Sequence, residues 1–507
     1  MKTLWQIKHR LRTLGSACAL AWLSAIPLSA EEPYVHWAKT VADAFGGFGV
    51  SMEVTGDGGL VGYGGDGAVR KFNPQGELEL INTNTLTGAG LSGRTTDALG
   101  NQYWIGTVYT NGTFNFPTVR GFFVAKFGPT NNLLWVRNNE IPEENGSETS
   151  PSCISVDSGG NIAVGGITTG RLKLGAFESD GDRGPFFCKY DANGNLLWAR
   201  KVASQFTTPW SLSCNDIALD GSGNVIACGF LREGSSDFGG TTVYPGAVHE
   251  YGADWFIAKY NPNGELLWVT LDYAQSLAVD KHGDIYVAFV WWQQAVRGIA
   301  KLNGNGDLLW QKNLPAYFMY GLTLDEQGQP VFSGEFEGTV QFDAITLRSR
   351  GELDFFVAKA DVDGNVLWAI AGGGPSEDWP SHYSRPVACD SAGNVFLTAL
   401  IYTYGGNGSL GSFDGINLVP NPNYNGYGTL VVARLSERPP MQMAPSAEGG
   451  QLSWPAKATN YVLEAATNLA PGSAWNPVTN TPTVSGRERN LQLPAIVPAK
   501  FFRLRRP

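Results

Sequence analysis

The chain has 507 residues, including 64 Gly and 28 Pro, and only 16% of them are charged, against about 25% in average proteins. Hydrophobic residues make up 43% and aromatic residues 12%, which excludes an intrinsically disordered chain and favours short strands joined by many turns. Residues 31–440 hold 43 acidic but only 25 basic side chains, so nucleic acid is excluded as an expected partner, because phosphate binding needs a basic surface.

Residues 1–30 have the features of a secretory signal peptide. Four basic side chains precede an apolar stretch over residues 14–28, and Leu28-Ser29-Ala30 offers a small residue at the cleavage point. The stretch is shorter than the roughly 20 residues of a membrane-spanning helix, and Gly15 stands where a lipoprotein signal around Cys18 needs Leu. We therefore expect cleavage near Ala30, no transmembrane segment in the mature chain, and a secreted, periplasmic or outer-surface location.

Two sequence phrases alternate along residues 34–440. The first is a small residue followed by Lys, a short turn and Leu-Leu-Trp, as in Ala258-Lys259 to Leu267-Trp268. The second is an apolar run ending in Asp, followed by Gly-Asn and another apolar run, as around Asp220. Each phrase occurs seven times when degenerate copies are counted, with a period of about 58 residues, which indicates a repeat architecture.

The turn residues predict four strands in each repeat. Asp starts a turn by bonding the backbone two residues further on, and Gly takes the positive φ that closes a hairpin. The first strand is thus joined to the second, and the third to the fourth, by tight hairpins. The connection from the second to the third strand is variable and often long.

Seven such repeats predict an all-β fold, a seven-bladed β-propeller over residues 31–440. The last copy, Ala433-Arg434-Leu435, lacks its Leu-Leu-Trp half, while Trp37-Ala38-Lys39 near the N-terminus carries the missing piece. We therefore expect residues 34–40 to pair beside residues 431–433 as a clasp strand that leaves no edge strand unpaired.

Two segments carry the repeat most fully: Asp254-Trp-Phe-Ile-Ala-Lys-Tyr260 and Asp354-Phe-Phe-Val-Ala-Lys359. They resemble the SBBP-type bacterial β-propeller repeat, and the resemblance covers about residues 34–440. The first repeat departs from the pattern because it lacks the Trp and the Ala-Lys pair. The first and second strands also resemble NHL repeats. The resemblance implies a secreted or cell-surface protein and carries no catalytic residue.

The C-terminal residues form a separate module in this interpretation. Residues 441–450 are expected to be a linker, and residues 451–507 a small β-sandwich-like domain with short alternating runs at 452–454, 461–464, 475–478, 491–493 and 501–504. The module resembles the fibronectin-III-like or sorting-type tails of secreted bacterial proteins. Its basic end, with Arg503, Arg505 and Arg506, either contacts an anionic cell surface or is simply solvated.

Hairpin geometry separates two rims of the predicted propeller. The turn rim holds the two tight hairpins of every repeat. The variable rim holds the other connections, of which residues 138–152, 202–213, 231–254, 371–386 and 402–428 are the longest; such variation on one face marks the binding face of repeat proteins. Aromatic and His side chains near the variable rim are ligand candidates, with packing between blades as the alternative for each: Trp210, Trp291, Trp292, Tyr317, Tyr320, Trp379, His382 and Tyr383.

Two functions follow from this pattern. The first is a non-catalytic binding or adhesion scaffold for a glycan or protein ligand, and the alternative is a hydrolase or lyase that acts on an extracellular polymer. No catalytic or nucleotide-binding motif is present, so no catalytic residue and no cofactor is expected. The carboxylate pairs Glu143-Glu144 and Glu377-Asp378 are expected to be solvated in loops.

No metal site is expected either. Asp361-Val-Asp363-Gly364-Asn365 resembles the start of a calcium loop, but the same place in other repeats is a hairpin turn. Five cysteines remain after residue 30, so at least one has no partner within a monomer, and their pairing is left open: Cys153, Cys188, Cys214, Cys228 and Cys389.

Overall fold

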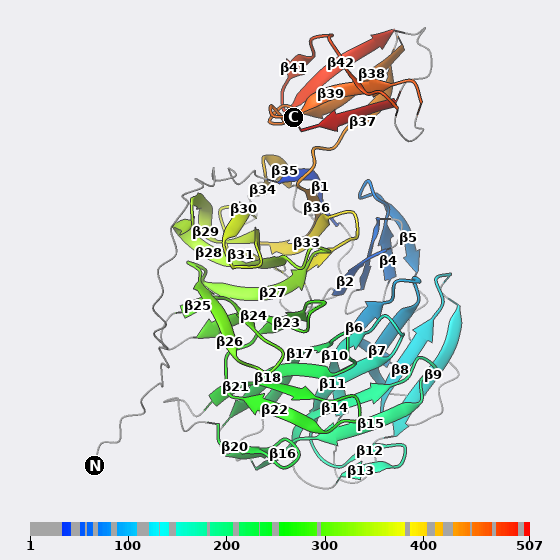
Figure 1. Ribbon diagram of the computed structural model, residues 1–507, viewed down its shortest axis with the longest axis vertical. Coiled ribbons are helices and arrows are strands. Elements are labelled where there is room, and N and C mark those ends of the chain that lie inside the picture. The colour runs from blue at the N-terminus through cyan, green and yellow to red at the C-terminus, as the bar shows by residue number, and fades with distance from the viewer. Residues whose placement is uncertain are drawn as a thin grey trace, which may run out of the picture. The chain divides into compact units, whose positions relative to one another are not determined.

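The computed structural model describes residues 33–41, 51–55, 58–63, 69–82, 89–108, 121–130, 132–140, 149–179, 183–205, 212–232, 234–245, 253–291, 296–380, 386–402, 411–418, 429–446, 449–468, 473–494 and 501–506. All regular elements in these ranges are β-strands (Figure 1). Within them there is no helix that could cross a membrane. The expected signal peptide, residues 1–30, lies outside the described residues.

Five antiparallel sheets each consist of four strands that pair in the order of the chain, and two larger sheets contain a related four-strand pattern. Sheet 1 contains β2 (Ser51–Val54), β3 (Leu60–Tyr63), β4 (Val69–Phe72) and β5 (Leu78–Asn82). Sheet 2 contains β6 (Ala89–Thr96), β7 (Gln102–Val108), β8 (Gly121–Phe127) and β9 (Leu133–Glu140). Sheet 3 contains β10 (Thr149–Val156), β11 (Ile162–Thr168), β14 (Gly184–Tyr190) and β15 (Leu196–Lys201). Sheets 4 and 5 contain β17 (Leu212–Leu219), β18 (Val225–Arg232), β21 (Ala253–Tyr260) and β22 (Leu266–Thr270); and β23 (Ser276–Val279), β24 (Ile285–Trp291), β25 (Val296–Leu302) and β26 (Leu308–Asn313).

Sheets 6 and 7 differ from the others in one respect each. Sheet 6 contains β27 (Phe318–Leu324), the long strands β28 (Pro330–Phe342) and β29 (Ile345–Ala360), and β30 (Val366–Gly373). Sheet 7 contains β32 (Val387–Cys389), β33 (Asn394–Ile401), β36 (Thr429–Ser436) and, as its fourth strand, β1 (Tyr34–Thr40); β31 (Asp378–Pro380) also pairs with β33. Short strands decorate the variable connections: β12 (Leu172–Leu174), β13 (Phe177–Ser179), β16 (Ala203–Gln205), β19 (Ser235–Asp237), β20 (Thr242–Val243), β34 (Gly411–Phe413) and β35 (Ile416–Leu418).

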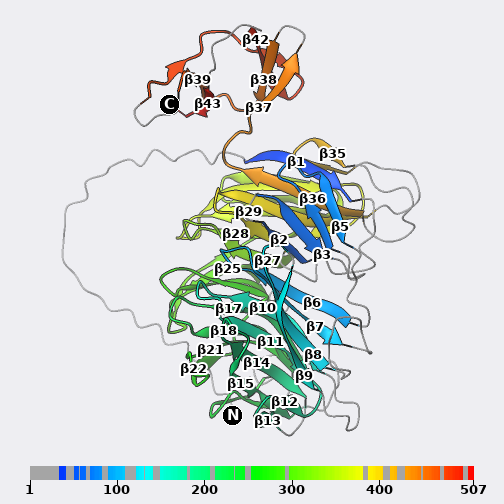
Figure 2. The ribbon, with the colours of Figure 1, turned by 90° about the vertical axis from the view of Figure 1, so that its right-hand side faces the viewer.

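The fourth strand of sheet 7 comes from the other end of the chain. β1 runs antiparallel to β36, with Ala38 opposite Ala433 and Thr40 opposite Val431 (Figure 2). This is the partner that the repeated Trp-Ala-Lys phrase predicts for residues 34–40. The pairing covers the edge of β36, which would otherwise present unpaired backbone groups.

The first strands of the seven sheets contact one another in sequence. β6, β10, β17, β23, β27 and β32 each contact the next, and β2 contacts both β32 and β6. The first strand of each sheet is therefore the inner one and the fourth the outer one. This is the blade arrangement of a β-propeller, so the chain is an all-β protein of the propeller type.

The turn rim owes its regularity to the repeated Asp and Gly. In the hairpin between β6 and β7, Asp97 Oδ1 accepts bonds from the backbone N–H of Leu99 and Asn101, both at 2.9 Å. Gly100 adopts a φ of 80°, which a side chain would strain. The turn at Asp361 is built in the same way, with the N–H groups of Asp363 and Asn365 as donors, so it is a hairpin turn as predicted.

The Trp of the outer strand joins each sheet to the next. Trp198 Nε1 donates to Pro262 O, 2.9 Å away in the next sheet, and the indole lies over Gly264, where a methyl group would come within 2.6 Å of it. The same arrangement links sheets 2 to 3, 4 to 5 and 5 to 6 through Trp135, Trp268 and Trp310. Trp368 instead donates to Glu437 after β36.

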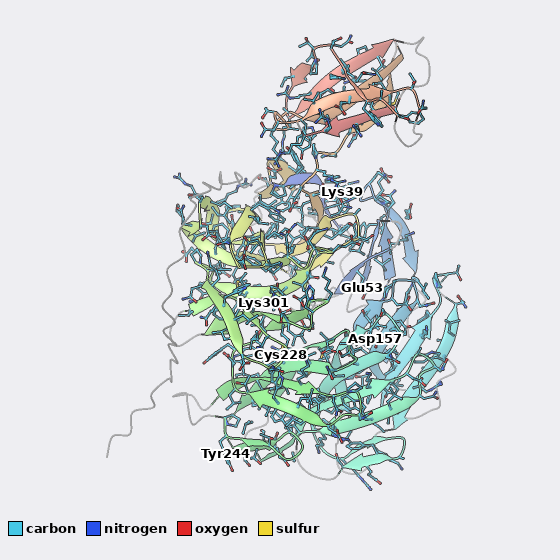
Figure 3. All side chains as sticks on the ribbon, in the orientation of Figure 1. Lys39, Glu53, Asp157, Cys228, Tyr244 and Lys301 are labelled. Atoms are coloured by element: carbon cyan, nitrogen blue, oxygen red, sulfur yellow. The ribbon has the colours of Figure 1, made fainter. Side chains whose placement is uncertain are left out.

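Two other contacts join sheet 1 to its neighbours, sheets 7 and 2. Trp37 of β1 donates to Pro74 O at 2.9 Å and lies over Gly76, and so links sheet 7 to sheet 1. Sheet 1 has no outer Trp, and its inner strand is joined to that of sheet 2 by an ion pair of 3.4 Å between Glu53, labelled in Figure 3, and the buried Arg94.

The recurring Lys of the third strand also has a structural role. Lys259 lies 3.0 Å from Asp220 and donates to Gly304 O in the next sheet, and Lys359 lies 2.8 Å from Asp325. Lys301, labelled in Figure 3, is paired with Asp280 and Asp284. Burial lowers its pKa, but the hydrogen bonds and charges of Tyr286 and Asp284 outweigh that effect and raise it. These contacts give the repeated Lys and Trp side chains a structural role in the blades.

The C-terminal residues form two small sheets, in pairing orders β37-β38-β42-β41 and β40-β39-β43. The strands are β37 (Gln442–Ser446), β38 (Gly449–Pro455), β39 (Val462–Ala466), β40 (Asn476–Pro477), β41 (Thr483–Ser485), β42 (Glu488–Pro494) and β43 (Phe501–Arg505). Part of the expected linker, residues 441–450, forms β37 and the start of β38. The sequence did not reveal these strands, because a polar edge strand and a linker have the same local composition.

Two arginines of the basic C-terminal end are held inside this module. Arg503 and Arg505 both bond Glu464, at 2.9 and 2.7 Å, and Arg503 lies over the ring of Trp475. Their guanidinium groups are therefore already paired in the free protein.

Candidate functional site

The structure describes two of the predicted ligand residues in full. Tyr317 precedes β27 and is 46% exposed, and Tyr320 lies within β27 and is partly buried. Trp291 ends β24 and Trp379 lies in β31, but only their backbone is described. The other predicted residues lie outside the described residues: Trp210, Trp292, His382 and Tyr383.

Bulges interrupt the inner strands near the variable rim. The register shifts between Leu91 and Gly93, Pro151 and Cys153, Cys214 and Asp216, and Met319 and Gly321. An extra residue at a bulge is free of the ladder, and its side chain is redirected. In β27 that residue is Tyr320, so the bulge presents one of the predicted aromatic side chains.

Tyr320 meets a carboxyl group that the sequence does not single out. Its hydroxyl donates to Oε2 of Glu335 on β28, 3.1 Å away, and its ring packs against Phe318 with centroids 4.6 Å apart. Glu335 is 3% exposed, and its carbonyl accepts a bond from the N–H of Tyr317. Tyr317 also lies under the guanidinium of Arg297, 5.8 Å from its ring centroid. Two aromatic rings and one buried carboxyl are thus joined at the start of β27.

Two further buried carboxyls, besides that of Glu335, lie on the strands β29 and β31, which contact each other. Asp378 is fully buried and accepts backbone bonds from Gly374 and Tyr402. Asp354 is 1% exposed; one of its oxygens accepts a bond from the N–H of Arg350, and Oδ1 has no hydrogen-bond partner among the described residues. Gly373 makes room for it, since a methyl group there would lie 2.2 Å from Oδ1.

Burial raises the pKa of all three carboxyls. It raises the pKa of Glu335 to about 7, with a smaller contribution from the charge of Glu377 and against the bond from Tyr320. Burial also raises the pKa of Asp354 and of Asp378 to about 7 each, and the charge of Asp354 adds to the effect on Asp378. Each group is therefore able to gain or lose a proton near neutral pH.

These carboxyls correct one expectation. Glu377 and Asp378 were expected to be solvated in a loop, but Asp378 lies fully buried in the short strand β31, because its backbone pairs with β33. Glu143 and Glu144 lie outside the described residues. Glu335 and Asp354 carry no sequence signal of their own, since strand-like residues flank both and only the tertiary packing buries them.

The site can donate and accept hydrogen bonds and can stack a ring. In the part of the chain that the structure describes, no three His, Cys, Asp or Glu side chains gather in a way that could hold a metal ion. Tyr317 offers an exposed ring for stacking, whereas the three carboxyls are 0 to 3% exposed and lie beneath the surface.

Comparisons with known proteins give weak likenesses. No family model matches the chain. An uncharacterized WD repeat-containing protein of Acanthamoeba polyphaga mimivirus is 31% identical over 116 residues, which are 20% of this chain and 8% of that protein.

Solved structures resemble the fold at low identity. BamB from Moraxella catarrhalis has 11% identity and a TM-score of 0.37, over 80% of this chain and 99% of that one. The Dos1 propeller has 9% identity and a TM-score of 0.40, over 79% and 81%. A protein of unknown function from Bacteroides caccae has 12% identity and a TM-score of 0.34, over 61% and 96%. At these values the likenesses carry no inference about function.

Proposed function

We propose that the protein is an exported binding scaffold whose seven sheets are the blades of one ring, closed by β1, and that it holds a glycan or protein ligand on the variable rim. A propeller supplies a rigid frame on which variable connections can recognise a ligand. The contrast between the two rims is the observation that carries this proposal.

On the turn rim, the polar side chains of the hairpins form hydrogen bonds within their own hairpin. The repeated Asp and Asn side chains close their own hairpins, as Asp191 does with the N–H groups of Asn193 and Asn195. In the hairpin between the third and fourth strands, glycines such as Gly194 and Gly264 lie under the Trp residues of neighbouring sheets. Little recognition capacity is left on this rim.

The variable rim, in contrast, carries the bulges and the buried carboxyls. Tyr317 is 46% exposed beside Tyr320 and the buried Glu335, so an aromatic surface is available there. Aromatic rings stack on the apolar faces of sugars and anchor peptides. The excess of acidic side chains in residues 31–440 favours a neutral or cationic ligand.

The C-terminal domain is proposed to contact the cell surface. Because Glu464 already holds Arg503 and Arg505, this contact would not depend on a free basic cluster at the chain end. Loss of cell association after removal of residues 441–507, with the propeller still exported, would support the contact.

One observation favours the enzymatic alternative. A carboxyl whose pKa lies near 7 can act as a general acid or base at neutral pH, and Glu335 with the Tyr320 hydroxyl forms such a group. A polymer that binds the protein should therefore be tested for cleavage. If it is cleaved, Glu335→Gln should abolish product formation and retain binding.

The binding proposal is tested with the purified mature protein on glycan and peptide arrays, followed by titration of the strongest hit. Tyr317→Ala should weaken binding by at least about 10-fold, which is ~1.4 kcal/mol. The double change Trp210→Ala and Trp379→Ala should abolish it. Asn263→Ala on the turn rim is the matched control and should leave affinity unchanged. If the Asn263 control lost the ligand and the Tyr317 variant kept it, the proposed assignment of binding to the variable rim would be wrong.

A further inference from the structure

Two thiols face each other across the boundary between neighbouring blades. Cys153 follows the bulge of the inner strand β10, and Cys214 precedes the bulge of the inner strand β17. Their Sγ atoms lie 3.2 Å apart, although the residues are 61 positions apart in the chain. Both side chains are buried, at 7% and 2% exposed.

The space around this pair is shaped for two sulfur atoms. Gly165 lies opposite Cys153 on β11, and a methyl group there would come within 2.5 Å of Cys214 Sγ and 2.8 Å of Cys153 Sγ. Any larger residue at position 165 would displace one of the thiols. Ile217 closes the niche from β17, and the pair belongs to the apolar core between sheets 3 and 4.

The backbone beside the thiols is already tied across the same boundary. The bulged residue Ser152 donates its hydroxyl to Cys214 O at 2.6 Å. A disulfide has an S–S length of about 2.0 Å, so the sulfurs need to approach by about 1 Å, and this bond already ties the two strands to each other beside them.

We propose that Cys153 and Cys214 form a disulfide that joins β10 to β17 when the protein folds outside the cytoplasm. The two thiols release two protons and two electrons, and the electrons reduce the disulfide of a small-molecule or protein oxidant to two thiols by exchange. The physiological occurrence of the bond rests on the proposed export, because disulfides persist in oxidising compartments. The pairing itself rests on the geometry alone.

The bond is expected to form during folding rather than after it. The bond from Cys153, together with burial, raises the pKa of the Cys214 thiol well above its ordinary value. The attacking species in exchange is the thiolate, so a thiol that folds in the reduced form reacts slowly. Cys228, labelled in Figure 3, lies on β18, in the same sheet as Cys214. Cys188 is equally buried on β14, and burial raises its pKa to about 12.

The test is a thiol count with peptide mapping on the full mature chain. The denatured, reduced protein is refolded with glutathione disulfide, blocked with an alkylating reagent in denaturant, and digested. One linked peptide with Cys153 and Cys214 and three alkylated cysteines are expected, together with a mass loss of two hydrogen atoms. Cys214→Ser should remove the link, and the matched control Cys389→Ser should keep it. Five alkylated cysteines, or a link between other cysteines, would overturn the pairing.

The same map on protein exported by a living cell separates this inference from the proposed location. If the refolded protein carries the link and the exported protein also carries it, both proposals are supported. A link in the refolded protein that is missing from protein isolated from the cells would overturn formation of the bond in the cell and count against export to an oxidising compartment, while leaving the geometry in place.

Discussion

Replacing Trp37 by Ala should loosen the contacts that β1 makes with β36 and with sheet 1. Trp37 is 9% exposed, packs with Phe72 and Val432, and lies over Gly76. Truncation of a core Trp costs roughly 3–5 kcal/mol. The indole also loses its bond to Pro74 O, but Arg434 donates to the same carbonyl at 2.8 Å, so that oxygen is not left unsatisfied. We therefore expect a loss near 3 kcal/mol, the lower end of the range.

The assay is urea unfolding together with hydrogen exchange of β1 and β36. The matched control is Trp135→Ala, which removes the equivalent contact with Ala192 O between two blades that the chain itself connects. Both variants should lower the unfolding free energy, but only Trp37→Ala should speed exchange in β1. A change below about 0.5 kcal/mol for Trp37→Ala, the level of an ordinary surface substitution, would refute the role given to β1.

Three further predictions follow from single features. Because burial raises the folded pKa of Asp378 to about 7, above its unfolded value near 4, Asp378 should lower stability as the pH rises from about 4 to 7, by up to about 1.4 kcal/mol per pH unit. Asp378→Asn should make the fall of the urea midpoint across this window less steep, and the remaining slope should come from Glu335 and Asp354. Gly264→Ala should cost about 1–3 kcal/mol, because φ is +80° and Trp198 fills the space, whereas Gly221→Ala, with open space around it, should be nearly neutral in thermal unfolding. N-terminal sequencing of the exported protein should begin near Glu31, and an intact N-terminal Met would contradict the signal peptide.

The repeated elements could be predicted because their causes are local. Asp, Gly and Asn at fixed spacing determine each hairpin through bonds within five residues, so the strand ends could be placed without tertiary information. The pairing of β1 could also be predicted, since Trp37-Ala38-Lys39 repeats the phrase that ends the other blades. The role of the Trp in joining neighbouring sheets could not be predicted, because the backbone carbonyl to which its indole donates belongs to the next repeat.

The candidate site was predicted only in part. The variable rim and Tyr320 follow from loop length and composition, but the carboxyl that Tyr320 bonds lies on the next strand, and the burial of Glu335 depends on the long strands β28 and β29. Asp378 lies in a segment rich in Gly, Pro and Ser that is typical of a solvated loop, and its burial follows from the pairing of this segment with β33. Contacts between distant segments, such as Cys153 with Cys214, have no sequence signature.

The central claim, that ligand binds the variable rim, is tested most directly by hydrogen exchange of the protein with and without the strongest array ligand. Ligand should slow exchange at the start of β27, around Tyr317 and Tyr320, and around Gly374 and Asp378, with no change in the hairpins at 97–101 and 191–195. Protection confined to those hairpins, with the variable rim unchanged, would contradict it.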